Sequence, residues 1–503
     1  MRRAERRSAF AARGVCVMTL GELVGPEVPL PVAWQHVPIT GLAADSRAVK
    51  PGYLFAALPG SRTDGARFLA DALARGAAAI LLPQGAAPTL NGTPVIECPD
   101  PRRGLALVAA RFFGAQPEVA VAVTGTNGKT SVASFVRQLW EQIGFRAASL
   151  GTVGVVGPSG TQTLAHTTPD PIELHRILAE LAKSGVTHLA LEASSHGLEQ
   201  RRIDGLRLAA GAFTNISRDH LDYHPSFETY FNEKLRLFGK LLQPGAVAVI
   251  DVDSPGAPQV MEVAGRRGLS VISIGRAGET LKLLAAEQDG FGQRLIVLHA
   301  GGTETLRLPL VGAFQASNAL VAAGLCLAAH AEAEKVLPLL ANLRGARGRL
   351  DLAGTTSTGA PIFIDYAHTP DALAKALDAL RPYVRNRLTV VFGCGGDRDK
   401  GKRPQMGAVA VERADLAIVT DDNPRNEEPA DIRRQILAAA PGAIEVPGRA
   451  AAVAEAIAYL QQGDVLLIAG KGHETGQIVK GTVIPYSDHD AVESALKGRA
   501  ERA

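Results

Sequence analysis

The chain has 503 residues, of which 46% are hydrophobic and 20% charged, and its formal net charge is +3. This length exceeds one ordinary core, and the composition is that of a globular protein with two to four domains. Aromatic residues make up only 5%, and no Lys/Arg block with interleaved aromatics indicates a nucleic-acid groove. The four scattered cysteines form no C-x-x-C pair, which favours a reducing, cytoplasmic location.

The N-terminal segment is basic and alanine-rich and has no apolar core like that of a signal peptide. We expect residues 1–17 to be a disordered tail, and a true start at Met18 is the alternative. The chain contains no apolar run long enough to cross a bilayer, so we expect no membrane span.

Residues 18–116 predict a small α/β domain, because short apolar runs are separated by Gly and Pro. We expect strands at 78–82 and 94–98 and a helix that ends at Ala74. Two polar loops of this segment carry Ser, Arg and Asp side chains. Such loops are usually solvated turns, but these side chains would also suit the phosphates of a sugar nucleotide.

The segment 119–140 predicts a phosphate-binding loop between a strand and a helix. Five small apolar residues at 119–123 indicate a buried strand, and apolar residues recur at helical spacing over 132–140. Between them lies TGTNGKTS, at 124–131. Its glycines let backbone N–H groups face an anion at the N-terminus of the helix, where the helix dipole adds to the attraction.

Two side chains of this loop have the chemistry of nucleotide binding. Lys129 would reach the β- and γ-phosphates, and the Thr130 hydroxyl would hold Mg²⁺. The strict pattern has glycine where this chain has Val123, so the loop is a variant. A chance Gly-Lys-Thr turn in a glycine-rich chain is the alternative.

Residues 117–345 predict a parallel sheet, because strands alternate with helices. The strands expected at 188–192 and 212–215 are followed by polar loops that contain Glu192 and His220. Ligands of open parallel sheets bind beyond the carboxyl ends of the strands. We therefore expect these side chains and the phosphate loop to form one metal–phosphate site.

The rest of this region continues the alternation. A helix expected at 230–238 carries Lys234, which spacing alone identifies only as a surface lysine. Strands are expected at 246–251 and 271–274, followed by β-hairpins over 278–312 and an alanine-rich helix.

A Gly/Arg-rich turn at 344–349 marks a domain boundary, and 346–503 again alternates strands with helices. The strands end in polar loops at 365–371, 393–404, 421–427 and 470–474. These loops are rich in Arg and Lys and would suit a substrate with carboxylates.

Taken together, these motifs resemble those of the Mur ligases over nearly the whole chain. The matching stretches are TGTNGKTS (124–131), HTTPD (166–170), LEASSHGLEQRR (191–202), NISRDHLDYH (215–224), IDYAHTPDAL (364–373), FGCGGDRDKGKRP (392–404), DDNPR (421–425) and GKGHE (470–474). The resemblance is to the branch that joins a diamino acid to UDP-N-acetylmuramoyl-L-alanyl-D-glutamate in bacterial peptidoglycan synthesis.

The resemblance implies an α/β fold of three domains. Residues 18–116 would bind the uridine nucleotide of the substrate. Residues 117–345 would form a central ATP-binding domain with a phosphate loop and a parallel sheet, and residues 346–503 a Rossmann-like domain for the amino acid. We expect a monomer that uses ATP as co-substrate and Mg²⁺ as cofactor and forms an acyl phosphate.

The resemblance also implies roles for individual residues. The catalytic residues would be Lys129, Glu192, His220, Lys234 and His368. ATP would contact Gly125, Thr126, Asn127, Gly128, Lys129, Thr130, Ser131 and Asn318. The UDP-muramoyl dipeptide would contact Ala44, Ser46, Ser61, Arg62, Thr63, His166, Thr167, Thr168, Ser194, Gln200 and Arg202. The metal ligands would be Thr130, Glu192, His220 and a carbamylated Lys234.

The identity of the amino acid can be argued from charge. Meso-diaminopimelate differs from L-lysine by one carboxylate, which a fixed cationic fork would recognise. Arg425 supplies such a fork and Arg398 a second, although a surface turn is the alternative for Arg425. The expected contacts are Arg398, Asp422, Asn423, Pro424, Arg425, Gly470 and Glu474.

Two other functions stay open at this point. A sister ligase could add D-Ala-D-Ala or glutamate instead of a diamino acid. A nucleotide-dependent switch would use the phosphate loop for regulation, but it would leave the loops of residues 346–503 without a purpose.

Overall fold

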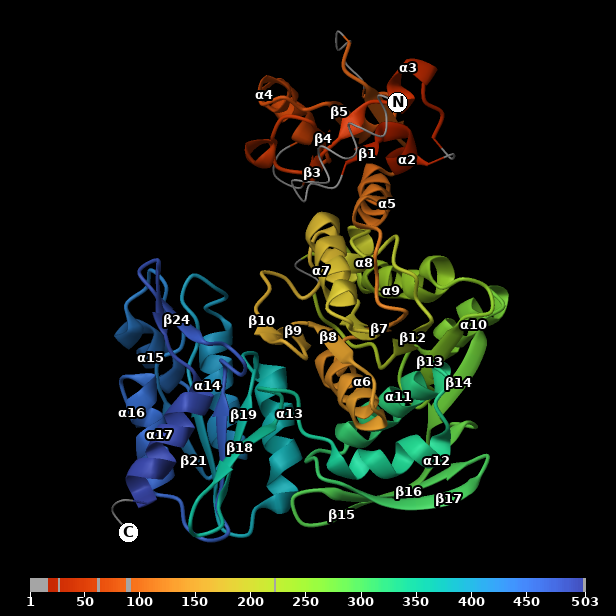
Figure 1. Cartoon of the computed structure of the whole chain (residues 1–503). Helices are drawn as coiled ribbons and strands as arrows, with labels where there is room; N and C mark the ends of the chain where they lie inside the picture. Colours follow the sequence, from red (N-terminus) through yellow and green to blue (C-terminus); the bar gives the residue numbers. More distant parts are fainter. Residues whose placement is uncertain (1–16, 26–27, 61–63, 87–91, 221–222, 501–503) are drawn as a thin grey trace. The chain divides into compact units, whose positions relative to one another are not determined.

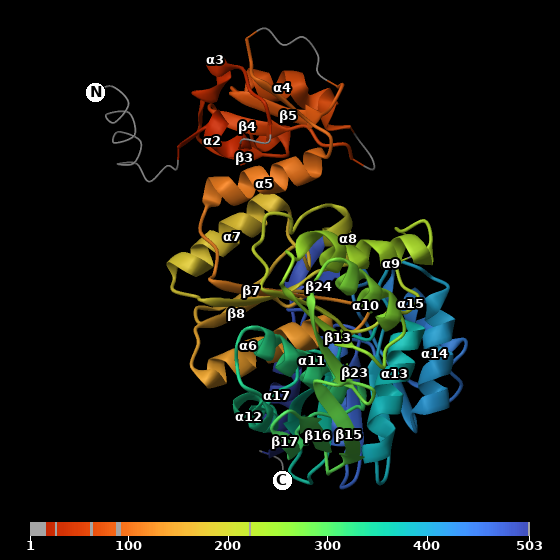
Figure 2. The ribbon, with the colours of Figure 1, turned by 90° about the vertical axis from the view of Figure 1, so that its right-hand side faces the viewer.

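The computed structural model describes residues 17–25, 28–60, 64–86, 92–220 and 223–500 (Figures 1 and 2). The predicted tail therefore lies, except for Val17, outside the described residues. The chain forms two compact units. The first contains the chain up to Glu279 together with Val321–Glu332, and the second contains Thr280–Leu320 and Ala333 onward.

The first unit begins with a small parallel sheet. Its strands lie in the order β3 (Gly41–Ala43), β4 (Tyr53–Ala56), β5 (Ala79–Pro83) and β6 (Val95–Cys98). The other elements of this part are β1 (Met18–Thr19), α2 (Leu20–Val24), α3 (Val32–Gln35), β2 (Pro38–Ile39), η1 (Ser46–Ala48), η2 (Gly65–Phe68), α4 (Leu69–Ala74) and α5 (Pro101–Phe113). The strands expected at 78–82 and 94–98 and the helix ending at Ala74 are confirmed.

The larger sheet of the first unit has six neighbouring parallel strands. Their order is β8 (Ala147–Gly151), β11 (His188–Glu192), β7 (Val119–Thr124), β12 (Ala210–Phe213), β13 (Val247–Asp251) and β14 (Ser270–Gly275). Two antiparallel strands, β9 (Gly154–Gly157) and β10 (Gly160–Gln162), extend the edge at β8. Because β7, β11 and β12 are parallel neighbours, the loops that follow them emerge at one edge.

Helices connect these strands in alternation. They are α6 (Lys129–Ile143), α7 (Pro171–Lys183), α8 (Ser195–Glu199), α9 (Phe227–Arg236), the π-helical turn η3 (Leu237–Leu241) and α10 (Ala257–Arg266). Helices α6 and α7 cover opposite faces of β7 and β8 (Figures 1 and 2). Helix α9 begins at Phe227, three residues before the predicted start, because Ser226 caps it by accepting a hydrogen bond from Thr229 N.

The second unit contains an antiparallel meander and a mostly parallel sheet. The meander consists of β15 (Leu281–Gln288), β16 (Gln293–His299) and β17 (Gly302–Leu308), as expected for 278–312. The sheet has the order β18 (Asp351–Thr355), β19 (Pro361–Asp365), β23 (Val465–Ala469), β20 (Leu388–Phe392), β21 (Leu416–Val419) and β22 (Ile444–Glu445), with only β18 antiparallel. A hairpin, β24 (Gly476–Val479) and β25 (Thr482–Pro485), follows β23.

The helical elements after β17 complete the second unit, except that helix α11 is divided between the units at Leu320. They are α11 (Phe314–Ala328), α12 (Ala333–Val336), η4 (Leu337–Asn342), α13 (Pro370–Leu380), η5 (Arg381–Tyr383), α14 (Lys402–Arg413), α15 (Pro429–Leu437), α16 (Arg449–Ala458) and α17 (Asp488–Ala500). The strands predicted in this region are confirmed to within a residue or two, and so is the α/β fold class.

Several non-glycine residues have a positive φ, which costs roughly 1–2 kcal/mol each for an L-residue. His220 (φ 52°), Asp397 (φ 53°) and Arg425 (φ 52°) lie in loops that the sequence analysis identified as functional. Lys480 (φ 47°) lies in the turn of the β24–β25 hairpin.

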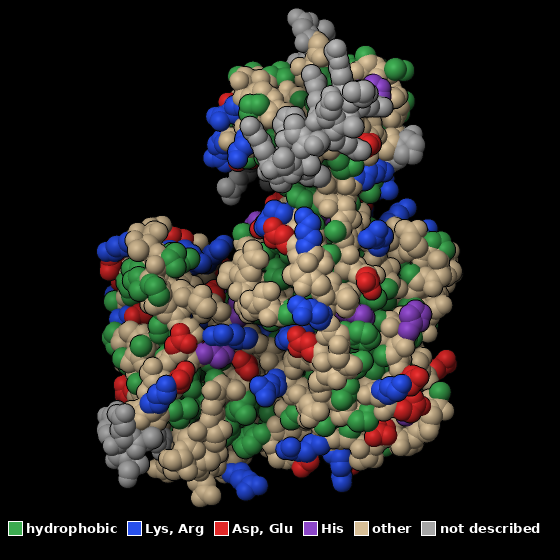
Figure 3. All heavy atoms as spheres, viewed as in Figure 1, with side chains coloured by type: hydrophobic (Ala, Val, Ile, Leu, Met, Phe, Trp, Pro, Cys, Tyr) green, Lys and Arg blue, Asp and Glu red, His purple; other side chains and the backbone are tan. Residues whose placement is uncertain are grey.

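The surface bears out the weak charge bias of the sequence. On the face shown in Figure 3, Lys and Arg side chains are interspersed with Asp and Glu and form no long basic stripe. Within the described residues, every helix is too short or too polar to span a bilayer.

Candidate active site

The phosphate loop joins β7 to α6 in the way that its sequence predicts. Gly128 has a left-handed conformation (φ 88°) directly before the first residue of α6. Gly125 (φ 148°) has no room for a side chain, because a Cβ atom there would lie 2.0 Å from Thr214 Oγ1. Asn127 N donates to Asn215 Oδ1 at 3.0 Å. The loop that follows β12, which begins with Thr214 and Asn215, therefore fixes the shape of the phosphate loop.

Two lysines donate to one carbonyl oxygen of this loop. Lys129 Nζ lies 2.8 Å from Gly125 O and 2.8 Å from Thr126 O. Lys234 Nζ, on α9, lies 2.8 Å from the same Gly125 oxygen. Lys234 is 1% exposed, and its burial and the nearby Lys129 ammonium hold its pKa well below the usual value for lysine. The lysine that looked like a surface residue by spacing is a core residue beside the phosphate loop.

Glu192 ends β11 and is buried, with 2% of its surface exposed. Thr130 Oγ1 donates to Glu192 Oε2 at 3.0 Å, and Thr152 N donates to Oε1 at 2.7 Å. Gly151 makes this arrangement possible, since a Cβ atom there would lie 2.0 Å from Oε1. Both donors, a hydroxyl and a backbone N–H, are uncharged groups.

Tyr230 borders both of the remaining predicted metal ligands. Its ring centroid lies 4.4 Å from Lys234 Nζ and 6.1 Å from the ring centroid of His220. Its hydroxyl lies 3.0 Å from Thr126 Oγ1. His220 is 44% exposed, and its Nε2 atom lies 3.6 Å from Asp219 Oδ2.

The predicted metal ligands include only one carboxylate. Within the described residues, no three His, Cys, Asp or Glu side chains are arranged as a metal site. Glu192 and the Thr130 hydroxyl are hard oxygen donors of the kind that Mg²⁺ prefers. The set would gain a second anionic oxygen donor only if Lys234 were carbamylated.

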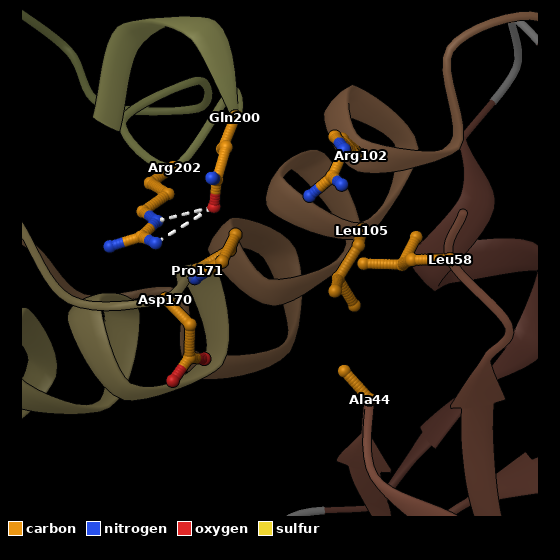
Figure 4. Close-up of a pocket in the computed structure, with 8 residues that line it drawn as sticks. All are labelled: Ala44, Leu58, Arg102, Leu105, Asp170, Pro171, Gln200 and Arg202. Carbon is orange, nitrogen blue, oxygen red and sulfur yellow. Dashed lines mark hydrogen bonds between the residues drawn. The ribbon is translucent and has the colours of Figure 1, made fainter. Parts of the chain in front are cut away.

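A pocket in the first unit is lined by three residues predicted for the dipeptide substrate, Ala44, Gln200 and Arg202 (Figure 4). Arg202 donates to Gln200 Oε1 from Nη2 at 2.7 Å and to the Thr168 carbonyl from Nη1 at 2.6 Å. Burial lowers the pKa of Arg202. The other lining residues are Asp170, the last residue of the HTTPD motif, and four residues outside the motifs, Leu58, Arg102, Leu105 and Pro171.

Other predicted substrate residues lie close to Glu192. Thr168 Oγ1 donates to the Glu192 carbonyl at 3.0 Å and lies 2.9 Å from Ser194 Oγ. Thr167 Oγ1 lies 3.1 Å from Thr152 Oγ1. His166 is exposed.

The substrate contacts predicted in the small N-terminal sheet are described only in part. Ser46 is buried at the start of η1, after its capping residue Asp45. Ser61, Arg62 and Thr63 lie outside the described residues. Asn318, predicted to contact ATP, is buried on α11, where its Nδ2 donates to Gln315 Oε1 at 3.0 Å.

In the second unit, the loops after β21 and β23 form one hydrogen-bonded cluster. Asn423 Nδ2 donates to Glu474 Oε2 at 2.9 Å. Lys471 Nζ donates to Asn423 Oδ1 and to Glu474 Oε2, both at 2.9 Å. Gly470 (φ 116°) lies against Asp422, where a Cβ atom would lie 2.7 Å from Asp422 Oδ2.

The two predicted arginines are held differently. Arg425 Nη1 donates to Gly396 O at 2.8 Å, which fixes the guanidinium over the loop after β20. Arg398 is exposed. Pro424 packs its carbonyl against Gly396, where a Cβ atom would lie 1.9 Å from that oxygen. His368, in the loop after β19, is also exposed, and its Nδ1 lies 2.8 Å from Tyr366 O.

The sequence alone did not identify several residues that contact the predicted site residues. Gly151 and Thr152 shape the surroundings of Glu192, Lys471 joins Asn423 to Glu474, and Tyr230 borders Lys234. Lys471 lies inside the GKGHE motif, which was a usable signal. The contacts of Gly151 and Thr152 come from strand pairing, for which the sequence carries no local signal.

Comparison with known families gives matches along most of the chain. The profile of the Mur ligase family catalytic domain matches residues 38–113, that of the Mur ligase middle domain matches 123–326, and that of the Mur ligase glutamate ligase domain matches 348–472.

Individual proteins match over nearly their full length. The UDP-N-acetylmuramoyl-L-alanyl-D-glutamate–2,6-diaminopimelate ligase of Bradyrhizobium diazoefficiens is 55% identical over 486 residues, which is 96% of this chain and 100% of that protein. The ligase of the same name from a Chelativorans species is 54% identical over 461 residues, 92% of this chain and 95% of that protein. A solved structure of a ligase of this name matches with a TM-score of 0.72 and 32% identity, and covers 96% of this chain and 100% of that one.

Proposed function

The chain belongs to the Mur ligase family, and we propose that it joins meso-2,6-diaminopimelate to the γ-carboxylate of D-Glu in UDP-N-acetylmuramoyl-L-alanyl-D-glutamate. The reaction uses ATP and supplies a precursor of bacterial peptidoglycan in the cytoplasm. The observation that carries this proposal is the identity of 55% with a ligase of that name over 100% of that protein's length. The match also covers 96% of this chain.

We propose that the three predicted domains divide the substrates among them. Residues 18–116 bind the uridine nucleotide, 117–345 bind ATP and 346–503 bind the amino acid. The separate family matches at 38–113, 123–326 and 348–472 support this division. We expect the enzyme to act as a monomer.

The first chemical step requires two anions to approach each other. The γ-carboxylate of D-Glu attacks the γ-phosphate of ATP, the bond from that phosphorus to the β,γ-bridging oxygen breaks, and ADP leaves. Backbone N–H groups of 125–131 and the Lys129 ammonium would neutralise the phosphate charge. Lys129 would exchange its hydrogen bonds to Gly125 O and Thr126 O for phosphate oxygens.

Glu192 and Thr130 would hold a Mg²⁺ ion, which their oxygen chemistry and the buried negative charge of Glu192 support. When bound, Mg²⁺ supplies positive charge against the phosphate oxygens. His220 and carbamylated Lys234 would hold a second ion. Asn318 would lie against the adenine of ATP, as the resemblance implies.

Carbamylation of Lys234 is supported by its surroundings. The neutral amine is the form that attacks carbon dioxide, and burial and Lys129 both favour that form at Lys234. As two protonated lysines, Lys129 and Lys234 would place two positive charges against one carbonyl oxygen. A carbamate at Lys234 replaces one of these charges with a negative one.

In the second step, the amine of diaminopimelate attacks the acyl phosphate, and phosphate leaves from the tetrahedral intermediate. Thr167, Thr168, Ser194, Gln200 and Arg202 would position the dipeptide, together with His166 and the nucleotide contacts at 44, 46 and 61–63.

Arg398 and Arg425 would bind the distal carboxylate of the amino acid, while Glu474 and Gly470 O would accept from its ammonium. Asp422, Asn423 and Pro424 form the rest of that site. We also propose His368 as a catalytic residue.

The proposal is tested by ADP release from the purified chain with each substrate left out in turn. We expect turnover only with ATP, the UDP-muramoyl dipeptide and meso-diaminopimelate all present. Equal turnover with L-lysine would refute the amino-acid assignment, and D-Ala-D-Ala or glutamate as acceptor would indicate a sister ligase. Nucleotide hydrolysis that does not require the dipeptide would indicate a switch.

A further inference from the structure

Lys471 is a fully buried lysine in the second unit. It follows β23 and lies between two glycines, and its side chain has 0% of its surface exposed. A buried ammonium is costly unless charged or polar acceptors compensate for its lost hydration. Lys471 Nζ has two such acceptors, Asn423 Oδ1 and Glu474 Oε2, each at 2.9 Å.

These contacts determine which way the Asn423 amide faces. Its Oδ1 atom accepts from Lys471 Nζ and from Ile478 N, both at 2.9 Å. Because an ammonium and a backbone N–H can only donate, the oxygen must face them. The amide nitrogen then faces Glu474 Oε2 at 2.9 Å and retains one N–H for another acceptor.

The two carboxylate oxygens of Glu474 differ in their hydrogen bonds. Oε2 accepts from both Lys471 and Asn423. In the part of the chain that the structure describes, no protein donor reaches Oε1. These hydrogen bonds leave one Asn423 amide N–H and one Glu474 carboxylate oxygen unused among the described residues. Such a donor and acceptor are the complements of a carboxylate and an ammonium on one carbon.

We propose that Lys471 is a positioning residue for amino-acid specificity. It need not touch the substrate. It fixes the Asn423 amide and the Glu474 carboxylate in the orientation that recognises the distal amino-acid group of diaminopimelate. This inference rests on the proposed function, and it adds Lys471 to the residues that set specificity.

The test is a Lys471→Met variant, which keeps the length of the side chain and removes the charge and the donors. We expect its KM for meso-diaminopimelate to rise at least about tenfold, as for loss of a charge-assisted hydrogen bond. The KM values for ATP and for the dipeptide should stay within about twofold, because those ligands would contact other loops. Preference for meso-diaminopimelate over L-lysine, measured as the ratio of kcat/KM values, should fall.

Lys375→Met is the control, because Lys375 is an exposed lysine on α13 whose Nζ donates to Asp371 Oδ2 at 2.6 Å. We expect no change in any KM for this variant. If Lys471→Met does not fold, as judged by circular dichroism, Lys471→Gln retains a shorter donor, and a partial rise in the same KM supports the proposal.

The outcomes separate this inference from the proposed function. If the wild type does not use meso-diaminopimelate, the proposed function itself fails. If the wild type uses it and the folded Lys471 variants keep its KM and its preference over L-lysine, the positioning role is refuted and the function stands. A uniform fall in kcat with every KM unchanged would also refute it, because a merely structural lysine would give that result.

Discussion

Gly151 shows how one missing side chain shapes the site. A Cβ atom at this position would lie 2.0 Å from Glu192 Oε1. The backbone of Gly151 has no positive φ, so space alone requires the glycine. Glu192 in turn accepts from Thr130 and Thr152. The position of the carboxylate therefore depends on a residue that never reacts.

We expect Gly151→Ala to displace the Glu192 carboxylate and to lower kcat by about 100-fold, the effect of a displacement near 1 Å in an active site. The measurement is steady-state ADP release, with thermal unfolding to confirm folding. Gly265→Ala on α10 is the control, since a Cβ atom there meets nothing within 4 Å. Equal kcat in the two variants would show that Glu192 is not needed at its present position.

At position 425, arginine and lysine would carry the same charge but differ in the geometry of their donors. Arg425 donates from Nη1 to Gly396 O, and within the described part of the chain its other guanidinium N–H groups stay available for a carboxylate. We expect Arg425→Lys to raise the KM for meso-diaminopimelate about tenfold and to leave the KM for ATP unchanged. Arg434→Lys, on the exposed face of α15, is the control. An unchanged preference over L-lysine would contradict the role of the fork.

The proposed carbamate on Lys234 can be tested by removing the side chain and adding a free carboxylic acid. We expect Lys234→Ala to lose nearly all activity, because both the amine and its carbamate disappear. Short carboxylic acids such as acetate or propionate should restore part of it by placing a carboxylate in the vacated space. Lys240→Ala, an exposed lysine in η3, should behave as wild type. Activity of Lys234→Ala without added acid would argue against a carbamate.

At the scale of elements, helix α7 carries a buried histidine whose charge affects stability. His175 is 1% exposed, with Nε2 3.3 Å from Asp204 O, and burial lowers its pKa to about 4 from 6.5. Between those pH values the unfolded chain binds a proton that the folded protein does not. The folded state should therefore lose stability as the pH falls from about 6.5 to 4.

We expect His175→Leu to remove this pH dependence. The loss of unfolding free energy between pH 7 and pH 4.5 should be smaller than in the wild type by about 2 kcal/mol, because the pKa of His175 is about 4 in the folded protein and 6.5 in the unfolded chain. Urea unfolding at the two pH values measures it. His36→Gln, at an exposed position, should retain the wild-type difference. Parallel losses in His175→Leu and the wild type would mean that His175 does not titrate in this range.

The sequence predicted individual elements better than the contacts between them. The strand at 119–123, the loop and the helix after it follow from hydrophobic spacing and glycine, and all are present as β7 and α6. The contact of Gly151 with Glu192 depends on how β8 pairs with β11, and 41 positions separate the two residues. The burial of Lys234 depends on packing of α9 against the phosphate loop, which a periodicity argument cannot detect.

At the scale of the molecule, the two compact units have separate buried cores. The second unit contains a fully buried ion pair, in which Arg449 Nε and Nη2 donate to Asp488 at 2.7 and 2.8 Å. The Asp488 carboxylate raises the pKa of Arg449 further above its usual value, although burial opposes it. Removing one partner of such a pair leaves a buried charge without compensation.

We expect Arg449→Met to destabilise the second unit by about 3–5 kcal/mol and to leave the first unit unaffected. Scanning calorimetry should show one unfolding transition shifted to lower temperature and another in place. Lys497→Met removes an exposed ion pair on α17 and should change stability by less than about 1 kcal/mol. One cooperative transition that shifts as a whole would show that the two units unfold together.

The non-glycine residues with a positive φ limit which positions can be substituted to raise the stability of this protein. Glycine at His220, Asp397 or Arg425 would relax the backbone, but each replacement deletes a side chain from a loop of the proposed site. Lys480 offers the same relief, because its side chain is not a predicted contact and pairs with the exposed Glu428. Its backbone N–H, which donates to Arg425 O at 2.6 Å, would be kept by any residue other than proline. Lys480 precedes Gly481 (φ 77°) in a two-residue hairpin turn, a position where asparagine is favoured. Thermostabilisation by loop redesign should therefore begin with Lys480→Asn, far along the chain from the phosphate loop.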